Sequence, residues 1–441
     1  MKIMIALGCL MPFVSSGQDF DSEKLVNYLN LLEEKNRAMG SIAISESGEE
    51  VFSHSFGYSR VEKGEKAGDH TIYRVGSVSK TFTAALVLLL KDEGKLQLDD
   101  PISTYFDGLP NGDKITIRHL LLHRSGLFNF TNSENYTDWM EEEQSREKLL
   151  TLFRGQEPEF EPAERTEYSN TNFVLLSFLI EDLADMTFSE ALKKKITEPL
   201  GLKNTFITND INNTENHAQS YNFTGEWKVS TETHPSVPLG AGALSSTTAD
   251  LNQFLESLFG GRLITEESLK EMTNPVNGFG MGIFQLPFYD MIMWGHTGGI
   301  DGYMSVFAWH EKKQLAVSAN FNGLSMSMND ILIATLSLYL GKDFEIPEIT
   351  APMVLSEEEL IQYTGYYTSE TFPLNIRITA EGNTLMGQAT GQPPFPLEPR
   401  GDHIFTLDQV GLRLTFEPEE NKMVLKQGGM NFVMYRSGDE E

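Results

Sequence analysis

The chain contains a single cysteine, Cys9, among its 441 residues, so no disulfide can form within it. Basic residues are also scarce, because 34 Lys and Arg stand against 63 Asp and Glu and give a formal net charge of -29. A surface this acidic repels nucleic-acid phosphates and anionic lipids, so we exclude nucleic acid as a partner. We expect the folded domains to be stabilised by packing without covalent cross-links.

Long hydrophobic runs are also lacking, and none is long enough to span a membrane. A shorter one lies at the N-terminus, where Lys2 precedes the apolar residues 3–14 and small polar residues follow. This order predicts a secretory signal peptide over residues 1–18. Lipid attachment at Cys9 is a less favoured alternative, because the apolar stretch before it is short. We therefore expect an exported protein, periplasmic or extracellular.

Hydrophobic periodicity predicts an α+β domain over residues 19–344. Alternating segments predict strands near both of its ends, and residues 77–258 between them have a largely helical pattern. The predicted strands cover residues 41–45, 50–58, 291–294, 303–309 and 314–320, and a predicted helix covers 328–340. Both ends of the domain would therefore contribute to one antiparallel sheet.

A second, all-β domain is predicted over residues 355–441. Residues 345–354 carry two prolines and little periodicity, which is typical of a linker. Ser356 and Glu359 have the spacing of a helix capping box. From Tyr363 onward, short alternating runs separated by glycines and polar turns predict a small barrel. The clearest of these runs are residues 374–379, 403–407, 412–416 and 423–427.

The most informative motif pairs Ser77 with Lys80 at the start of a strongly apolar run. At helical spacing the two side chains share one face, so the lysine can take the serine proton and make Ser77 a nucleophile. Gly76 suits a tight turn before the helix, and Gly94 offers a C-cap after it. The hydroxyl would then lie at the positive end of a buried helix.

Acyl transfer also needs a proton path to the leaving group and donors for the oxyanion. Tyr168 and Asn170 offer a phenol and an amide in one predicted tight turn, and His296-Thr297-Gly298-Gly299 places a titratable group in a glycine-rich segment. These short patterns are weak when isolated, as two decoys show. Ser145 and Lys148 repeat the first spacing in a charged stretch, where a helix-capping serine is expected. Tyr28-Leu29-Asn30 repeats the second on an ordinary amphipathic helix.

Taken in order, Ser77-x-x-Lys80, Tyr168-x-Asn170 and His296-Thr297-Gly298 resemble the motifs of the serine β-lactamase and penicillin-binding-protein superfamily. The resemblance covers about residues 23–340. It points to the branch with class C β-lactamases, D-Ala-D-Ala carboxypeptidases, D-aminopeptidases and related esterases. It implies a β-lactamase/transpeptidase-like fold without metal or organic cofactor. The C-terminal module resembles the lipocalin-like domain of some members.

The resemblance also implies a role for each motif residue. Ser77 would form the acyl-enzyme, and Lys80 and Tyr168 would be the proton-transfer pair, with either of them as the base. Asn170 would orient Lys80 and the substrate amide. Thr297-Gly298-Gly299 would bind substrate, and the N–H groups of Ser77 and Gly299 would form the oxyanion hole.

His296 is expected to be catalytic together with Ser77, Lys80 and Tyr168, but it departs from many relatives, which have a charged lysine there. Because histidine is mostly neutral near pH 7, binding of a free substrate carboxylate is placed in doubt, and the expectation moves toward esterases and aminopeptidases. A purely structural histidine is the alternative.

Three other features were weighed as sites. His119 and His123 have the spacing of zinc ligands on a helix, but Leu120 replaces the glutamate of a hydrolytic zinc helix, so we expect two structural histidines and no metal. The acidic run 141–143 is expected to be a solvated face. Residues 128–164 mix aromatic and acidic side chains, and we hypothesise that they form one wall of the substrate cleft; a surface insertion is the alternative.

We therefore expect an exported serine hydrolase that acts through a Ser77 acyl-enzyme on a small ester or amide. One alternative is a D-Ala-D-Ala carboxypeptidase or D-aminopeptidase. An alternative of another class is a non-catalytic binding protein on a penicillin-binding fold, which the complete set of motif residues disfavours.

Overall fold

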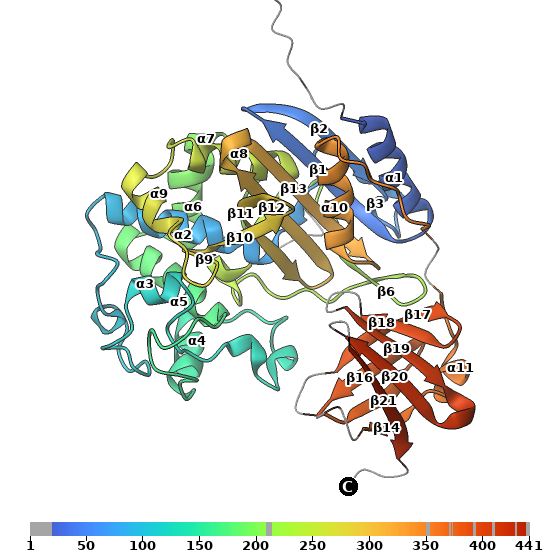
Figure 1. Cartoon of the computed structure of the whole chain (residues 1–441). Coiled ribbons are helices and arrows are strands. Elements are labelled where there is room, and N and C mark those ends of the chain that lie inside the picture. The colour runs from blue at the N-terminus through green and yellow to red at the C-terminus, as the bar shows by residue number, and fades with distance from the viewer. Residues whose placement is uncertain are drawn as a thin grey trace, which may run out of the picture.

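The computed structural model describes residues 20–208, 214–349, 353–369, 372, 374–390, 394–407, 411–427 and 430–437. The expected signal peptide lies outside these residues. Within them, no helix combines the length and the apolar character that crossing a bilayer requires. Figure 1 shows a large body of sheet and helices and, below it, a barrel coloured orange to red. We call the large body the hydrolase domain, after the activity expected from its motifs.

One antiparallel sheet forms the centre of the hydrolase domain, in the order β2-β1-β13-β12-β11-β10-β9. The first two strands come from the start of the domain and the other five from its end, and they meet where β1 pairs with β13. The strands are β1 (Ala38–Glu46), β2 (Glu49–Phe56), β9 (Phe279–Gly280), β10 (Ile283–Phe288), β11 (Met291–Ile300), β12 (Tyr303–His310) and β13 (Leu315–Leu324). The predicted sheet from both ends of the domain is therefore confirmed.

Two strand predictions were incomplete. The predicted strand ended at Trp294, because glycine disfavours strands. In the structure β11 continues to Ile300, and its glycines pair with β12. β9 and β10 were not predicted, since Gly282 and Pro287 interrupt their alternating pattern.

Helices cover both faces of the sheet (Figure 1). α1 (Ser22–Glu34) and α10 (Met328–Tyr339) lie against one face and bury a shared apolar cluster. α8 (Thr248–Phe259) packs on the other face, beside the helical region. As predicted, α10 is followed by Gly341, which has a positive φ of 60°.

The other elements of the domain are short apart from two central helices. The helices are α2 (Ser79–Asp92), α3 (Ile117–Leu121), α4 (Arg146–Arg154), α5 (Asn170–Ala184), α6 (Phe188–Leu192), α7 (Glu198–Leu200) and α9 (Glu266–Met272). The additional strands are β3 (Tyr58–Arg60), β4 (Glu65–Lys66), β5 (Tyr73–Arg74), β6 (Tyr221–Phe223), β7 (Trp227–Val229) and β8 (Ser245–Ser246).

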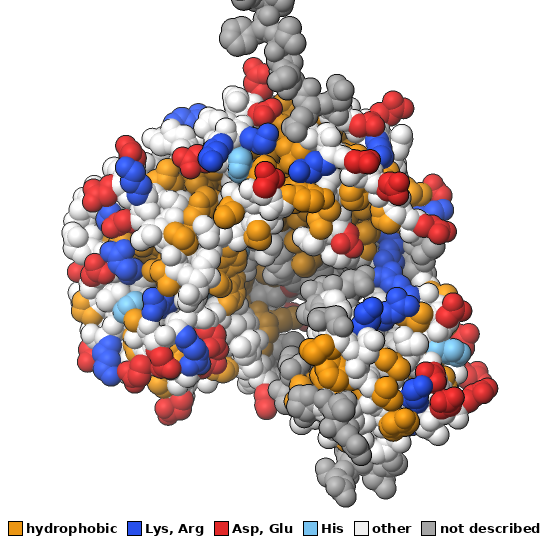
Figure 2. Space-filling model, viewed as in Figure 1, with side chains coloured by type: hydrophobic (Ala, Val, Ile, Leu, Met, Phe, Trp, Pro, Cys, Tyr) orange, Lys and Arg blue, Asp and Glu red, His pale blue; other side chains and the backbone are white. Residues whose placement is uncertain are grey.

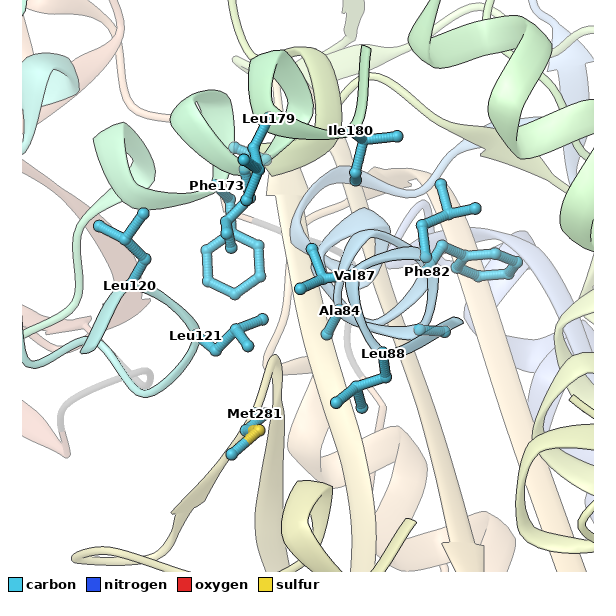
Figure 3. Packing of buried hydrophobic residues seen from close by; sticks show 14 of the residues in the cluster. Phe82, Ala84, Val87, Leu88, Leu120, Leu121, Phe173, Leu179, Ile180 and Met281 are labelled. Carbon is cyan, nitrogen blue, oxygen red and sulfur yellow. The ribbon is translucent and has the colours of Figure 1, made fainter. Parts of the chain in front are cut away.

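Helix α2 passes through the main core, and its side chains are buried on nearly every side. Figure 3 shows Phe82 and Val87 of α2 beside residues of α5, such as Ile180, and of α3. The helix ends where predicted, at Asp92, and Gly94 follows in the left-handed conformation with φ of 74°. A helix enclosed in this way is a rigid support for the residues in its first turn.

The C-terminal domain is a closed barrel of eight antiparallel strands, β14 to β21. A helix precedes them, α11 (Glu357–Ile361), and it begins with the predicted Ser356–Glu359 capping box. The strands are β14 (Gly365–Thr368), β15 (Ile376–Glu381), β16 (Thr384–Ala389), β17 (Phe395–Gly401), β18 (Ile404–Leu407), β19 (Leu412–Glu417), β20 (Lys422–Gln427) and β21 (Met430–Ser437). The alternating runs thus correctly predicted a barrel, although four of its strands were not found individually.

The barrel is joined to the hydrolase domain through charged side chains. Arg37, at the end of the α1–β1 connection, is only 5% exposed and pairs with Glu398 of β17. Glu398 also pairs with Arg400 at 3.0 Å. In Figure 2, Lys and Arg side chains gather where the two domains meet, on a face otherwise dotted with acidic groups.

Candidate active site

Ser77 lies in a single 3₁₀ turn, Gly76–Val78, that leads directly into α2. Gly76 has a φ of +50°, and a Cβ there would lie 2.9 Å from the N and O atoms of Gly299 on β11. Only glycine permits this close approach without displacement. The turn therefore holds the backbone of Ser77 beside Gly299, as the predicted oxyanion hole requires.

Lys80 is completely buried in the first turn of α2. Its Nζ is within hydrogen-bond distance of three oxygens: Ser77 Oγ at 3.0 Å, Asn170 Oδ1 at 2.8 Å and the Ala241 carbonyl at 2.6 Å. None of these oxygens belongs to a carboxylate. Burial lowers the pKa of Lys80 well below its usual value, which favours the neutral amine.

Tyr168 completes the contacts of the nucleophile, because its Oη donates a hydrogen bond of 2.7 Å to Ser77 Oγ. Burial raises the pKa of the phenol, and the hydrogen bond to Ser77 opposes part of that shift. The predicted tight turn around Tyr168 was wrong. Tyr168 has no assigned secondary structure, and the next residue, Ser169, is the extended N-cap of α5, with φ of -140° and ψ of 122°.

Asn170, the first residue of α5, links Lys80 to the cleft wall. Its Oδ1 accepts from Lys80, and its Nδ2 donates to Thr131 Oγ1 at 3.0 Å. Its backbone N–H donates to Asn129 Oδ1 at 3.0 Å. The structure thus brings together Ser77 and Lys80 from one part of the chain and Tyr168 and Asn170 from another.

The motif His296-Thr297-Gly298-Gly299 lies on β11, and its histidine makes no hydrogen bond to Ser77. His296 is 1% exposed, its Nδ1 donates to the Thr297 carbonyl, and its ring lies 4.2 Å from that of Phe284 and 6.4 Å from that of Tyr168. Burial, with a smaller effect of Lys80, lowers its pKa to about 3. His296 is therefore a neutral neighbour of the phenol and is not among the residues lining the cleft.

The remaining residues of that motif differ in their surroundings. Thr297 is exposed but lies outside the cleft lining, and Gly298 is buried against the Val75 carbonyl. Gly299 lines the cleft beside Ser77.

The active-site cleft is a cavity of about 410 Å³ with Ser77 on its surface. Its lining is Ser77, Phe130, Thr131, Tyr136, Met140, Asn170, Asn222, Ser230, Thr231, Thr233, Pro238, Ala241, Gly242, Gly299, Ile300 and Asp301. Phe130 to Met140 form part of the wall, so the hypothesis for residues 128–164 is confirmed for this portion. No sequence pattern could predict the role of the Ala241 carbonyl, since any residue type can supply a backbone carbonyl.

The lining of the cleft lacks the positive charge that would favour binding of an anion. None of the residues that line it is a lysine or arginine. The nearest guanidinium, that of Arg74, is buried and held at 2.7 Å by Asp301, whose other oxygen accepts from Thr233. The cleft therefore presents hydroxyls, amides and apolar side chains to a substrate.

The features weighed as alternatives have structural roles. Ser145 is the N-cap of α4, and its side chain accepts from the Lys148 N–H. His119 caps α3 by accepting from the Thr116 N–H at 3.2 Å. The acidic run 141–143 is exposed. Across the described part of the chain, no group of three or more His, Cys, Asp or Glu is placed to hold a metal ion.

Comparison with known proteins agrees with this geometry. The family model described as Beta-lactamase matches residues 28–339. Penicillin-binding protein 4* of Bacillus subtilis (strain 168) is 26% identical over 93% of this chain and 95% of its own length. Teichoic acid D-alanine hydrolase of Staphylococcus aureus (strain MRSA252) is 25% identical over 66% of this chain and 74% of its own length.

A solved structure shows the same relationship. The D-amino acid amidase of Ochrobactrum anthropi SV3 superposes with a TM-score of 0.65 and 25% identity, covering 72% of this chain and 98% of the amidase. The family match covers most of the chain and includes every motif residue discussed above. The chain belongs to the Beta-lactamase family of serine hydrolases.

Proposed function

We propose that this protein hydrolyses a small ester or amide through an acyl-enzyme formed on Ser77. The observation that carries the proposal is the position of Ser77 Oγ, 3.0 Å from Lys80 Nζ and 2.7 Å from Tyr168 Oη on the surface of the cleft. A nucleophile bonded to a buried amine and a buried phenol has both a base and an acid within reach.

The hydrogen bonds favour Lys80 as the base. A neutral amine has two protons and one lone pair; the protons fit Asn170 Oδ1 and the Ala241 carbonyl, and the lone pair then faces the Ser77 hydroxyl. Tyr168 has a raised pKa and keeps its proton. The opposite directions of these two pKa shifts support Lys80 as the base and Tyr168 as the acid.

The reaction then follows from these positions. Lys80 Nζ takes the Ser77 proton while Oγ bonds to the substrate carbonyl carbon, and the oxyanion lies between the N–H groups of Ser77 and Gly299. The bond to the leaving atom breaks as Tyr168 Oη protonates it, and the Lys80 ammonium returns a proton to Tyr168. Water next attacks the acyl carbon, releases the acid and restores the Ser77 hydroxyl.

The cleft favours an acyl group that is neutral or carries an ammonium. Among its lining residues there is no cation to pair with a carboxylate, and His296 is held neutral. Two of the relatives are named as a teichoic acid D-alanine hydrolase and a D-amino acid amidase, and a D-amino acyl group carries a free amine and no second carboxylate. We propose the same substrate class here, so a D-Ala-D-Ala carboxypeptidase is less well supported.

We also propose that the protein is exported. The support is the order of residues 1–18, a lysine, an apolar run and small residues, which is typical of a signal peptide.

Four substrates, offered to the parent protein and to Ser77→Ala, test the function: p-nitrophenyl acetate, D-alanine p-nitroanilide, nitrocefin and a D-alanyl-D-alanine peptide. Turnover and the mass of the protein adduct are measured. We expect Ser77-dependent hydrolysis of the ester and the D-alanine anilide. Turnover that survives in Ser77→Ala would overturn the assignment of Ser77 as the nucleophile. Preferential hydrolysis of the D-alanyl-D-alanine peptide would overturn the proposed substrate class. If the parent reacts with none of them and a fluorophosphonate does not label it, a binding protein is the better conclusion.

A further inference from the structure

We propose that His123 is the positioning residue that holds the Tyr168 phenol against Ser77. The inference rests on the proposed function, because it concerns the acid of that mechanism. From the sequence, His123 is expected to be a structural histidine and not a zinc ligand. The reaction described above does not use it.

Hydrogen bonds from His123 hold the chain on both sides of Tyr168. Its Nδ1 accepts the N–H of Ser169 at 3.1 Å, and its backbone carbonyl accepts the N–H of Glu167 at 2.9 Å. The residues immediately before and after the phenol are therefore fixed to one residue. Residues 166–169 lie outside any helix or sheet, so regular secondary structure does not fix their position.

The imidazole also contacts the phenol ring directly. The rings of His123 and Tyr168 are stacked with centroids 4.4 Å apart and planes 28° from parallel. The ring centroid of Phe173, a core residue of α5, lies 5.1 Å from that of His123. The imidazole is therefore itself held by the core. Two hydrogen bonds and one stacked ring together restrict both the backbone and the ring plane of Tyr168.

The chemistry of the site suits a neutral histidine. His123 is fully buried, and Nδ1 must be unprotonated to accept from Ser169, so the proton of the ring is on Nε2. Burial lowers the pKa of the imidazole well below its usual value. The acceptor at Nδ1 is thus kept available at neutral pH.

His123 does not contact the substrate. It is absent from the residues that line the cleft, and its backbone has a φ of +55°, a conformation in which asparagine is also tolerated. Loss of the acceptor should therefore slow acylation of Ser77 and leave substrate binding unchanged.

Two substitutions separate the acceptor from the ring. His123→Phe keeps an aromatic ring and removes the acceptor, whereas His123→Asn removes the ring and places an amide oxygen near the position of Nδ1. A matched control is His119→Phe, because His119 also accepts a backbone N–H through Nδ1, in the same segment, but makes no contact with Tyr168. The measurements are the rate of acylation by D-alanine p-nitroanilide, whose amine must be protonated to leave, KM, the rate of labelling by a fluorophosphonate, and the thermal midpoint.

We expect His123→Phe to lower the acylation rate by about 10- to 100-fold with KM unchanged, as a displaced acid would. His123→Asn should recover most of that rate, and His119→Phe should lower only the thermal midpoint. Parent-like acylation by His123→Phe, or equal losses of rate in His123→Phe and His119→Phe, would overturn the inference. If His123→Phe does not fold, His123→Ala takes its place in the comparison with His123→Asn. A parent protein that is not labelled at Ser77 would instead overturn the proposed function.

Discussion

The close approach between Gly76 and Gly299 allows a quantitative prediction for Gly76→Ala. The new Cβ would lie 2.9 Å from the N and O atoms of Gly299, whereas ordinary van der Waals contacts begin near 3.4 Å. The backbone of β11 must therefore move away from Ser77 by about 0.5 Å. That movement separates the two N–H groups proposed to bind the oxyanion.

The expected effect has a kinetic and a thermodynamic part. Loss of one oxyanion donor costs about 10²–10³-fold in rate, so a partial displacement should slow acylation by about 10- to 100-fold. The left-handed φ of +50° adds about 1–2 kcal/mol of backbone strain once a Cβ is present. The repulsion from β11 adds to this loss of stability.

Gly94→Ala is the matched control, since Gly94 has a φ of +74° but a Cβ there would meet nothing within 4 Å. It should lose about 1–2 kcal/mol of stability and no acylation rate. The assays are the p-nitrophenyl acetate burst and urea unfolding of both variants. The reasoning is refuted if Gly76→Ala acylates as fast as the parent, or if it is destabilised no more than Gly94→Ala.

Three further predictions test other parts of the structure. Tyr168→Phe, which removes the hydrogen bond to Ser77, should slow acylation by D-alanine p-nitroanilide, whose amine must be protonated to leave, by about 10²–10⁴-fold; a parent-like rate would contradict its role as the acid. Burial lowers the pKa of His217 from 6.5 to about 4, so the stability due to the neutral ring is present above pH 6.5 and is lost as the pH falls toward 4. Urea unfolding at pH 7 and pH 5 should therefore show that His217→Asn loses about 2 kcal/mol less than the parent, and equal losses would disprove the assignment. Glu398→Gln leaves the buried Arg37 without its charged partner and should lower the unfolding free energy by about 1–3 kcal/mol, whereas an unchanged urea midpoint would show that the pair does not stabilise the domain contact.

Local spacing explains what the sequence predicted well. Ser77 and Lys80 are one helical turn apart, so their proximity follows from the helix alone, and Gly94 marked the end of α2. The barrel and the sheet were predicted because residue alternation reports a half-buried strand. The decoy Ser145 was also interpreted correctly, since its polar surroundings offered no core to support a site.

Long-range contacts account for what was missed. His123 stacks on Tyr168, although no periodic pattern in the sequence relates these two residues. The Ala241 carbonyl belongs to the backbone, so no rule based on side chains could predict its contact with Lys80. Hydrogen bonds from Glu167 and Ser169 to His123 hold the chain on both sides of Tyr168, whereas local propensity predicted a turn there. The continuation of β11 through Gly298 depends on close packing against Val75, which only the folded sheet reveals.

The pairing of β1 with β13 has a consequence for how the chain is made. Ala38 pairs with Leu324, so 324 - 38 = 286 residues separate the two partners. At a synthesis rate of about 5–20 residues per second, β13 is made about 15–60 s after β1 and β2. During that interval β1, which is apolar and buried along almost its whole length in the folded domain, has an edge open to other chains. Nascent chains of this protein should therefore depend on a chaperone until the last strands of the hydrolase domain have been made.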